Sequence, residues 1–414
     1  MFEFTGVIEG FYGTPWSWDD RIEVCRFLAD HGADTYVYAP KSDPLHRDEW
    51  RTPYPTETLD AFERMVDESR VRVGFALSPG LSMRLDDADD RAALLAKFDA
   101  LRKVGVDLFC LALDDIDAAP GAGRDHGSLC TWLCDVLAPE QLLLVPTDYT
   151  SVAPNRYLDQ LSATTPVEVA IAWTGPTVVA DTITAADARL RAAALGGRDP
   201  WLWDNYPVND GIMTERLFMG PLRGRDEGLR DALSGYLANP MLQARASQLP
   251  VASAMAWARG ADPHDTWLDV AERFGWTVFA RSCDEIHLRS LIGDERREFL
   301  RAASECTAPD IESDVGAWIT QIRREADVAL AALDAVERAD AMQLLMAIAR
   351  WTRVPDPAVS VFGPRRSMRP VLGQDDQLRF APRAGAIDLG RNAVDELIVT
   401  LADGPLQKPE STGD

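Results

Sequence analysis

Short apolar segments alternate with amphipathic segments over the first 250 residues of the chain. Apolar runs of this length are typical of strands that are buried on both faces of a parallel sheet. Eight such strands are predicted, at Thr5–Ile8, Thr35–Ala39, Val71–Leu77, Leu108–Leu113, Leu142–Val145, Val167–Trp173, Trp201–Asp204 and Gly235–Ala238.

The segments between these strands repeat apolar residues at i, i+3 and i+4, which is the spacing of one helix face. Clear examples are Asp19–His31, Thr56–Ser69, Asp90–Val104 and Ala185–Leu195. Eight strand–helix units in about 250 residues match the size of a (β/α)8 TIM barrel, so the predicted fold class is α/β. A doubly wound open sheet is the alternative, but no glycine-rich phosphate loop follows the first strand.

Polar and aromatic residues cluster directly after the predicted strands. Barrel enzymes build their active sites at these carboxyl ends, so the pattern predicts a site there. The clusters are Glu9-Gly10-Phe11-Tyr12, Pro40-Lys41, Ser78-Pro79-Gly80, Asp114-Asp115, Thr147-Asp148-Tyr149, Trp173-Thr174-Gly175, Asp204-Asn205 and Asn239-Pro240.

After about residue 260 the pattern is helical throughout, beginning at Asp262-Pro263, a typical helix start. Three parts are therefore expected: a catalytic barrel over 1–260, a smaller helical domain over 261–353, and a Pro/Gly/Arg-rich segment over 354–414 that is partly disordered. The helices of the second part are predicted at Thr266–Phe274, Asp294–Cys306, Ile311–Val336 and Asp340–Trp351.

Composition narrows the function. The chain has 414 residues, with 66 acidic against 42 basic side chains and a net charge of −24, which disfavours nucleic acids and anionic membrane surfaces as partners. No segment approaches 18 consecutive apolar residues and the N-terminus does not resemble a signal peptide, so a cytoplasmic protein is expected. The six cysteines form no CxxC pair and are expected to be reduced.

The strand Leu108–Leu113 ends in two adjacent carboxylates, Asp114 and Asp115. Such a terminus is costly for a buried strand unless the carboxylates face a cavity, although Asp also commonly ends strands or caps helices. Adjacent carboxylates repel each other, which favours one ionised and one protonated group, as general acid/base chemistry requires. Neighbours in a strand point to opposite faces, so the chain must leave the strand at Asp114 for both to contact one ligand.

Several segments together resemble the O-GlcNAcases, the β-N-acetylglucosaminidase and bacterial hyaluronidase-like family 84 of glycoside hydrolases. They follow the family order and cover nearly all of residues 5–260. The segments are Gly6-Val7-Ile8-Glu9-Gly10-Phe11-Tyr12-Gly13-Thr14-Pro15-Trp16, Tyr36-Val37-Tyr38-Ala39-Pro40-Lys41, Leu113-Asp114-Asp115-Ile116-Asp117, Pro146-Thr147-Asp148-Tyr149, Trp173-Thr174-Gly175-Pro176, Trp203-Asp204-Asn205 with Asn209-Asp210, and Leu237-Ala238-Asn239-Pro240.

The resemblance implies a retaining exo-β-N-acetylglucosaminidase without an enzymatic nucleophile, in which the 2-acetamido oxygen of the substrate attacks the anomeric carbon and gives an oxazoline intermediate. It implies that Asp114, ionised, accepts the acetamido N–H and orients the attacking oxygen. Asp115, protonated, would donate to the leaving oxygen and later deprotonate water. Tyr149 would hydrogen-bond the acetamido or oxazoline oxygen, and Trp203 would form the wall beneath the sugar ring.

The remaining roles implied by the resemblance concern sugar hydroxyls. Asn205 and Asn239 would bind them as neutral two-way partners, and Asp210 would accept from O4 and O6. Lys41 would donate to a ring hydroxyl, which the Gly10 backbone would approach closely. Taken singly, each of these residues is also explained as a turn, cap, loop or core residue.

Other functions stay open on sequence grounds. A metal-dependent hydrolase would use Asp114, Asp115 and Asp117, but none of the five histidines lies at a predicted strand end. A hyaluronidase-type glycosidase and a catalytically silent sugar-binding barrel are the further alternatives. We expect no cofactor and no metal. The expected partner is a terminal β-linked N-acetylglucosamine on a glycan, glycoprotein or small glycoside, with a homo-oligomer formed through the helical domain as a further expectation.

Overall fold

A computed structural model describes residues 2–352, 359–363, 368–372, 378–382 and 392–403. The chain divides into two compact units. The first comprises Met1–Gly211 with Pro221–Trp267, and the second comprises Ile212–Gly220 with Leu268–Asp414.

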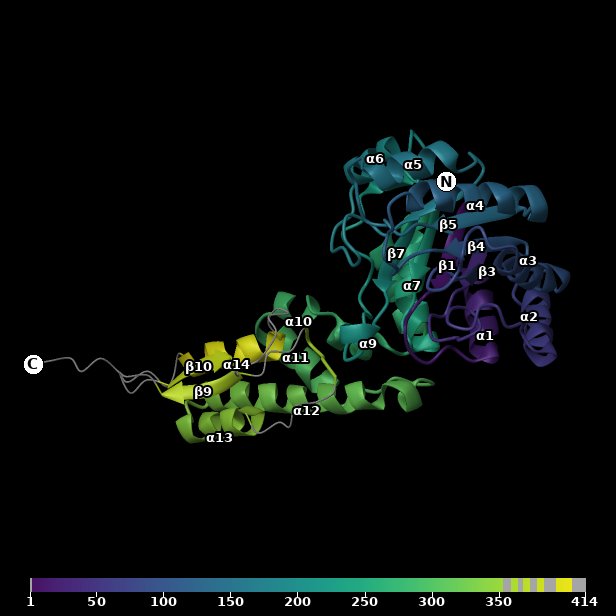
Figure 1. Ribbon diagram of the computed structural model, residues 1–414. Coiled ribbons are helices and arrows are strands. Elements are labelled where there is room, and N and C mark those ends of the chain that lie inside the picture. Colours follow the sequence, from purple (N-terminus) through teal and green to yellow (C-terminus); the bar gives the residue numbers. More distant parts are fainter. Residues whose placement is uncertain (1, 353–358, 364–367, 373–377, 383–391, 404–414) are drawn as a thin grey trace, which may run out of the picture. The chain divides into compact units, whose positions relative to one another are not determined.

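The first unit is a closed barrel of eight parallel strands in sequence order, and β1 pairs with β8 to close it (Figure 1). This confirms the predicted (β/α)8 fold class. All eight predicted strands are present, with ends that differ by at most a few residues. The strands are β1 Phe4–Glu9, β2 Thr35–Tyr38, β3 Arg72–Leu77, β4 Leu108–Ala112, β5 Gln141–Val145, β6 Ala170–Trp173, β7 Trp201–Pro207 and β8 Gly235–Asn239.

Helices follow the strands and cover the outside of the barrel (Figure 1). Two of them, α1 and α6, begin with a complete capping box, in which Ser17 pairs with Asp20 and Thr184 with Asp187. The helices of this part are α1 Trp18–Asp30, α2 Thr56–Glu68, α3 Ala88–Lys103, α4 Ala122–Leu137, α5 Arg156–Thr164, α6 Ala185–Ala194 and α7 Ala244–Ala258. The next helix, α8 Pro263–Arg273, begins in the first unit and ends in the second.

Apolar side chains from all eight strands fill the barrel interior, as expected for a packed core rather than a pore. Two strand carboxylates form buried ion pairs. Glu9, the last residue of β1, accepts two hydrogen bonds from Arg21 at 2.7 and 2.9 Å, and Asp204 accepts two from Arg225 at the same distances. Paired in this way, Glu9 is a structural residue although it belongs to a polar cluster after a predicted strand.

The second unit is mainly helical, which confirms the predicted helical C-terminal region. Its long helix α12 packs against α11, α13 and α14. The antiparallel pair β9–β10 and helix α14 fall inside 354–414, where only a Pro/Gly/Arg-rich segment was expected. The partial disorder expected of this segment concerns residues outside the described ones. The elements are α9 Thr277–Cys283, α10 His287–Ser290, α11 Gly293–Ser304, α12 Glu312–Glu337, α13 Ala341–Thr352, β9 Met368–Leu372, β10 Leu378–Pro382 and α14 Ala393–Asp403.

Among the described helices, none combines the length and the apolar character needed to cross a membrane.

Candidate active site

The two carboxylates after β4 leave the strand as the sequence requires. The strand ends at Ala112, and Asp115 has a left-handed backbone with a φ of 54°. Leu113 is held on both sides, because its N–H donates to Val145 O at 2.8 Å and its carbonyl accepts from Thr147 Oγ1 at 2.7 Å. This departure from the alternation of the strand lets Asp114 and Asp115 line the same cavity.

That cavity lies at the carboxyl ends of the strands, and its empty space measures about 570 Å³ when the open mouth is included. The structure brings all nine sequence-predicted site residues together in its lining. The lining residues are Gly10, Tyr12, Lys41, Asp114, Asp115, Val145, Tyr149, Thr174, Val178, Val179, Trp203, Asn205, Val208, Asp210 and Asn239.

Asp114 is buried and forms an ion pair with Lys41, whose Nζ donates to Asp114 Oδ2 at 2.5 Å. The other oxygen, Asp114 Oδ1, is buried without a hydrogen-bond partner among the described residues. Lys41 also lies 5.8 Å from the ring centroid of Trp203. An unsatisfied buried carboxylate oxygen is unfavourable, so the cavity offers a strong acceptor to a ligand that carries an N–H or O–H donor.

Asp115 is exposed and accepts two phenolic hydrogen bonds, from Tyr12 Oη at 2.7 Å and from Tyr149 Oη at 2.9 Å. Although the residue is exposed, its surroundings partly desolvate the carboxylate, which raises the pKa of Asp115. The two hydroxyls and the positive charges of Lys41 and Arg47 outweigh this effect and hold the pKa below its usual range. Burial and then Asp115 raise the pKa of both tyrosines, so they remain donors. Without a ligand Asp115 is therefore ionised, which differs from the protonated state that the acid role needs.

The wall and floor of the cavity are joined by one chain of hydrogen bonds. Asn205 Oδ1 accepts from Trp203 Nε1 and from Asn239 Nδ2, both at 2.9 Å, and Asn205 Nδ2 donates to Val178 O at 2.7 Å. Asn239 Oδ1 accepts from the Gly10 N–H at 3.1 Å. Both amides are thus engaged within the protein, where they fix the indole and the β1 end in place.

Asp210 is half-buried, and its Oδ2 accepts from the backbone N–H of Tyr12 at 2.8 Å. The carboxylate therefore positions the loop after β1 in addition to facing the cavity. Sequence reasoning did not assign a role to Tyr12, although it stands two residues after Gly10 in the same strand-end cluster. Thr174 belongs to a predicted strand-end cluster but was assigned no role, and the four lining valines carried no chemical signal in the sequence.

A metal-dependent alternative finds no support in the geometry. No group of three or more His, Cys, Asp or Glu side chains in the described parts of the chain is arranged to hold a metal ion. Asp117, the third carboxylate of that alternative, does not line the cavity.

Comparison with known proteins shows the family to which the chain belongs. A family model described as beta-N-acetylglucosaminidase matches residues 5–278. The Protein O-GlcNAcases of Rattus norvegicus and Mus musculus are each 31% identical over 271 residues, which is 61% of this chain and 29% of theirs. The chain thus spans less than a third of the length of these curated relatives.

Two solved structures share the fold. An O-GlcNAc hydrolase mutant from Thermobaculum terrenum superimposes with a TM-score of 0.77 at 23% identity, over 97% of this chain and 94% of the other. A protein named CpGH84B gives a TM-score of 0.78 at 20% identity, over 97% of this chain and 77% of the other.

Proposed function

The chain belongs to the beta-N-acetylglucosaminidase family of glycoside hydrolases, and we propose that it removes terminal β-linked N-acetylglucosamine with retention of configuration. The observation that carries the proposal is the buried, unpartnered Oδ1 of Asp114 beside an acid–base candidate, Asp115. A 2-acetamido group supplies the N–H that this oxygen lacks. Accepting that N–H turns the carbonyl oxygen of the acetamide toward the anomeric carbon.

In the first step the acetamido oxygen attacks the anomeric carbon, and the bond to the leaving oxygen breaks as Asp115 gives that oxygen its proton. The product is an oxazoline whose nitrogen carries developing positive charge. Asp114 stabilises this charge because it faces the N–H directly while Lys41 holds its other oxygen in place. No protein side chain forms a bond to the sugar.

In the second step Asp115, now ionised, takes a proton from water, which attacks the anomeric carbon and reopens the oxazoline ring. The acid role requires a protonated Asp115 beforehand. A bound substrate favours this protonated state, because its leaving oxygen and its acetamide compete for the positions of the Tyr12 and Tyr149 hydroxyls. Those hydroxyls stabilise the ionised carboxylate of Asp115 when no substrate is bound. Tyr149 is then free to donate to the acetamido or oxazoline oxygen.

The remaining cavity residues supply binding. The indole face of Trp203, fixed by Asn205, is the proposed platform for the sugar ring. Asp210, Asn239 and Lys41 are assigned to hydroxyls at the closed end, which favours exo-acting cleavage of terminal sugars. The aglycone is a protein Ser/Thr, a glycan or a small glycoside; a cytoplasmic location and a homo-oligomer through the helical region belong to the same proposal.

A chromogenic β-N-acetylglucosaminide tests the activity, and proton NMR of the first-formed product tests the stereochemistry. We expect initial β-product and inhibition by N-acetylglucosamine-thiazoline. Initial α-product or a trapped glycosyl-aspartate would refute the substrate-assisted scheme. Absence of turnover together with sugar binding would favour the silent barrel, and a rapid fall in the viscosity of hyaluronan would favour the hyaluronidase-type alternative.

A further inference from the structure

Arg47, in the loop between β2 and α2, is a buried cation that the proposed mechanism does not use. Its exposed fraction is 9%, and its Nη1 is buried without a hydrogen-bond partner among the described residues. The guanidinium instead lies 5.8 Å from the ring centroid of Tyr12. A buried charge without an ion pair is costly, so its retention in this position calls for a reason in the site.

The first part of the loop is firmly held from several sides. Asp43 accepts hydrogen bonds from Tyr38 Oη at 2.8 Å, from Tyr54 Oη at 2.6 Å and from the Leu45 N–H at 2.9 Å. Lys97, on α3, donates to Leu45 O at 2.5 Å. These contacts fix the loop directly before Arg47.

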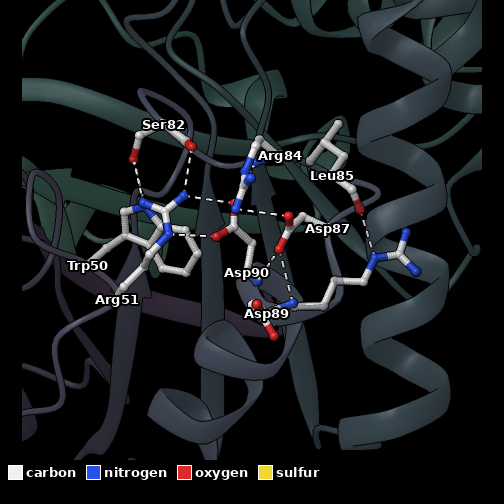
Figure 2. A network of polar contacts seen from close by, with 9 residues as sticks. Trp50, Arg51, Ser82, Arg84, Leu85, Asp87, Asp89 and Asp90 are labelled. Carbon is white, nitrogen blue, oxygen red and sulfur yellow. Dashed lines mark hydrogen bonds and ion pairs between the residues drawn. The ribbon is translucent and has the colours of Figure 1, made fainter.

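The last part of the loop is clamped to the next one along the barrel. Figure 2 shows Arg51 between Ser82 and Asp90, with Arg84 also next to Asp90. Arg51 donates to both oxygens of the buried Asp90, at 2.6 and 2.7 Å, and to Ser82 Oγ and O at 2.9 and 2.7 Å. Trp50 Nε1 also donates to Ser82 Oγ at 3.1 Å. Held at both ends, the loop cannot relax to bring Arg47 into water.

The groups that face Asp115 come from four loops. They are Tyr12, Lys41 and Arg47, Tyr149, and the neighbouring Asp114. Lys41 also lowers the pKa of Asp115, and does so more strongly than Arg47, but its charge is already paired with Asp114 at 2.5 Å. Among the described cations near Asp115, Arg47 is therefore the one whose charge no carboxylate neutralises. A cation against the face of a phenol ring makes the phenolic O–H a stronger hydrogen-bond donor. Arg47 lies against the ring of Tyr12, whose O–H donates to Asp115.

We propose that Arg47 is a positioning residue for the acid–base carboxylate: through the ring of Tyr12 and through its own field, it holds Asp115 ionised and anchored until a substrate displaces the tyrosine hydroxyl. The inference rests on the proposed function, since it gives Asp115 the acid–base role. The β2–α2 loop, which Asp90 holds in place, would then have two roles: it carries Lys41, and it keeps Arg47 in position to act on Asp115.

The test compares Arg47→Met, which removes the charge at similar length, with Arg47→Lys, which keeps it. Carbon-13 NMR of γ-labelled aspartate follows the titration of Asp115 in the full chain, with the signal assigned by its loss in Asp115→Asn. We expect Arg47→Met to raise the pKa of Asp115 and Arg47→Lys to leave it close to the wild-type value. Arg26→Met, which removes an exposed arginine paired with Glu68 at 2.6 Å, is the charge-matched control and should not shift it.

The pH dependence of kcat/KM is a second readout, which would not change if Arg47 had a purely structural role. The basic limb of the pH profile of kcat/KM, measured on a glycoside with a poor leaving group, should move to higher pH in Arg47→Met, because the protonated acid persists there. Since the variant removes a buried unpaired cation, its melting temperature should not fall. An unshifted NMR titration in Arg47→Met overturns the inference even if the wild type is fully active, whereas an inactive wild type with the expected NMR shift overturns only the proposed function.

Discussion

Gly10→Ala tests whether the sugar platform depends on the close approach of β1 to Trp203. A Cβ on Gly10 would lie 2.2 Å from Cζ2 and 2.7 Å from Cη2 of the indole, while ordinary contact begins at about 3.4 Å, so the ring must retreat by about 1.2 Å. The indole is tethered through Nε1 to Asn205, which in turn holds Asn239. We expect a loss of about 1–3 kcal/mol in the free energy of unfolding from the overpacking.

The larger effect should be on catalysis, because a displacement of about 1 Å can cost about 100-fold in rate. The assay is kcat/KM on an aryl β-N-acetylglucosaminide, with urea unfolding and tryptophan fluorescence on the same samples. The matched control is Gly316→Ala in the interior of α12, where an added Cβ meets nothing within 4 Å; it should keep full activity and gain up to about 1 kcal/mol. Wild-type kcat/KM in Gly10→Ala would refute the reasoning.

Three further predictions follow from other side chains. Asp115→Asn should slow substrates with poor leaving groups by about 10²–10⁴-fold and activated aryl glycosides far less, whereas Asp114→Asn should slow both; equal leaving-group dependence would contradict this division of roles. Asp210→Ala should lose most activity and discriminate less against β-linked N-acetylgalactosamine, measured as a ratio of kcat/KM values, because one carboxylate both faces O4 and holds the Tyr12 N–H. Burial, aided by the charge of Lys41, lowers the pKa of His46 to about 3. Because the folded state favours the neutral imidazole, the contribution of His46 to the free energy of unfolding is complete above about pH 6.5 and is lost as pH falls toward 3. His46→Gln should therefore flatten urea-derived stability between pH 4 and 6.5, where the wild type loses up to about 1.4 kcal/mol per pH unit; an unchanged slope would contradict this.

The barrel could be predicted because strands buried on both faces consist of continuous apolar runs, and eight of them at this spacing favour a closed barrel over an open sheet. The predicted strand ends are wrong where an apolar residue does not belong to a strand. The apolar pattern predicts a strand from Val167, but β6 begins at Ala170 and Val167 is 86% exposed. The excursion Ile212–Gly220, which belongs to the second unit, has no signal in the periodicity because its partners are distant in sequence.

The site could be predicted as a set of residues but not as a network. Strand ends show which side chains face the cavity, since parallel strands place their carboxyl ends at one rim. Pairings across the rim depend on how the loops meet after closure. Tyr12 therefore gave no indication that it binds Asp115, and Asn205 gave none that its amide is occupied by Trp203, Asn239 and Val178.

The unpaired charge of Arg47 has two opposed consequences for a general acid. A positive field lowers the fraction of Asp115 that carries the proton at neutral pH, and it also makes that proton a better one to donate, because the carboxylate left behind is stabilised. The net effect depends on the leaving group. A poor leaving group requires a strong acid at the moment of bond breaking, and the ionised Asp115 is then ready to activate water in the next step. Placing the cation behind Tyr12, outside the lining of the cavity, keeps its field in the site without offering the substrate a competing partner.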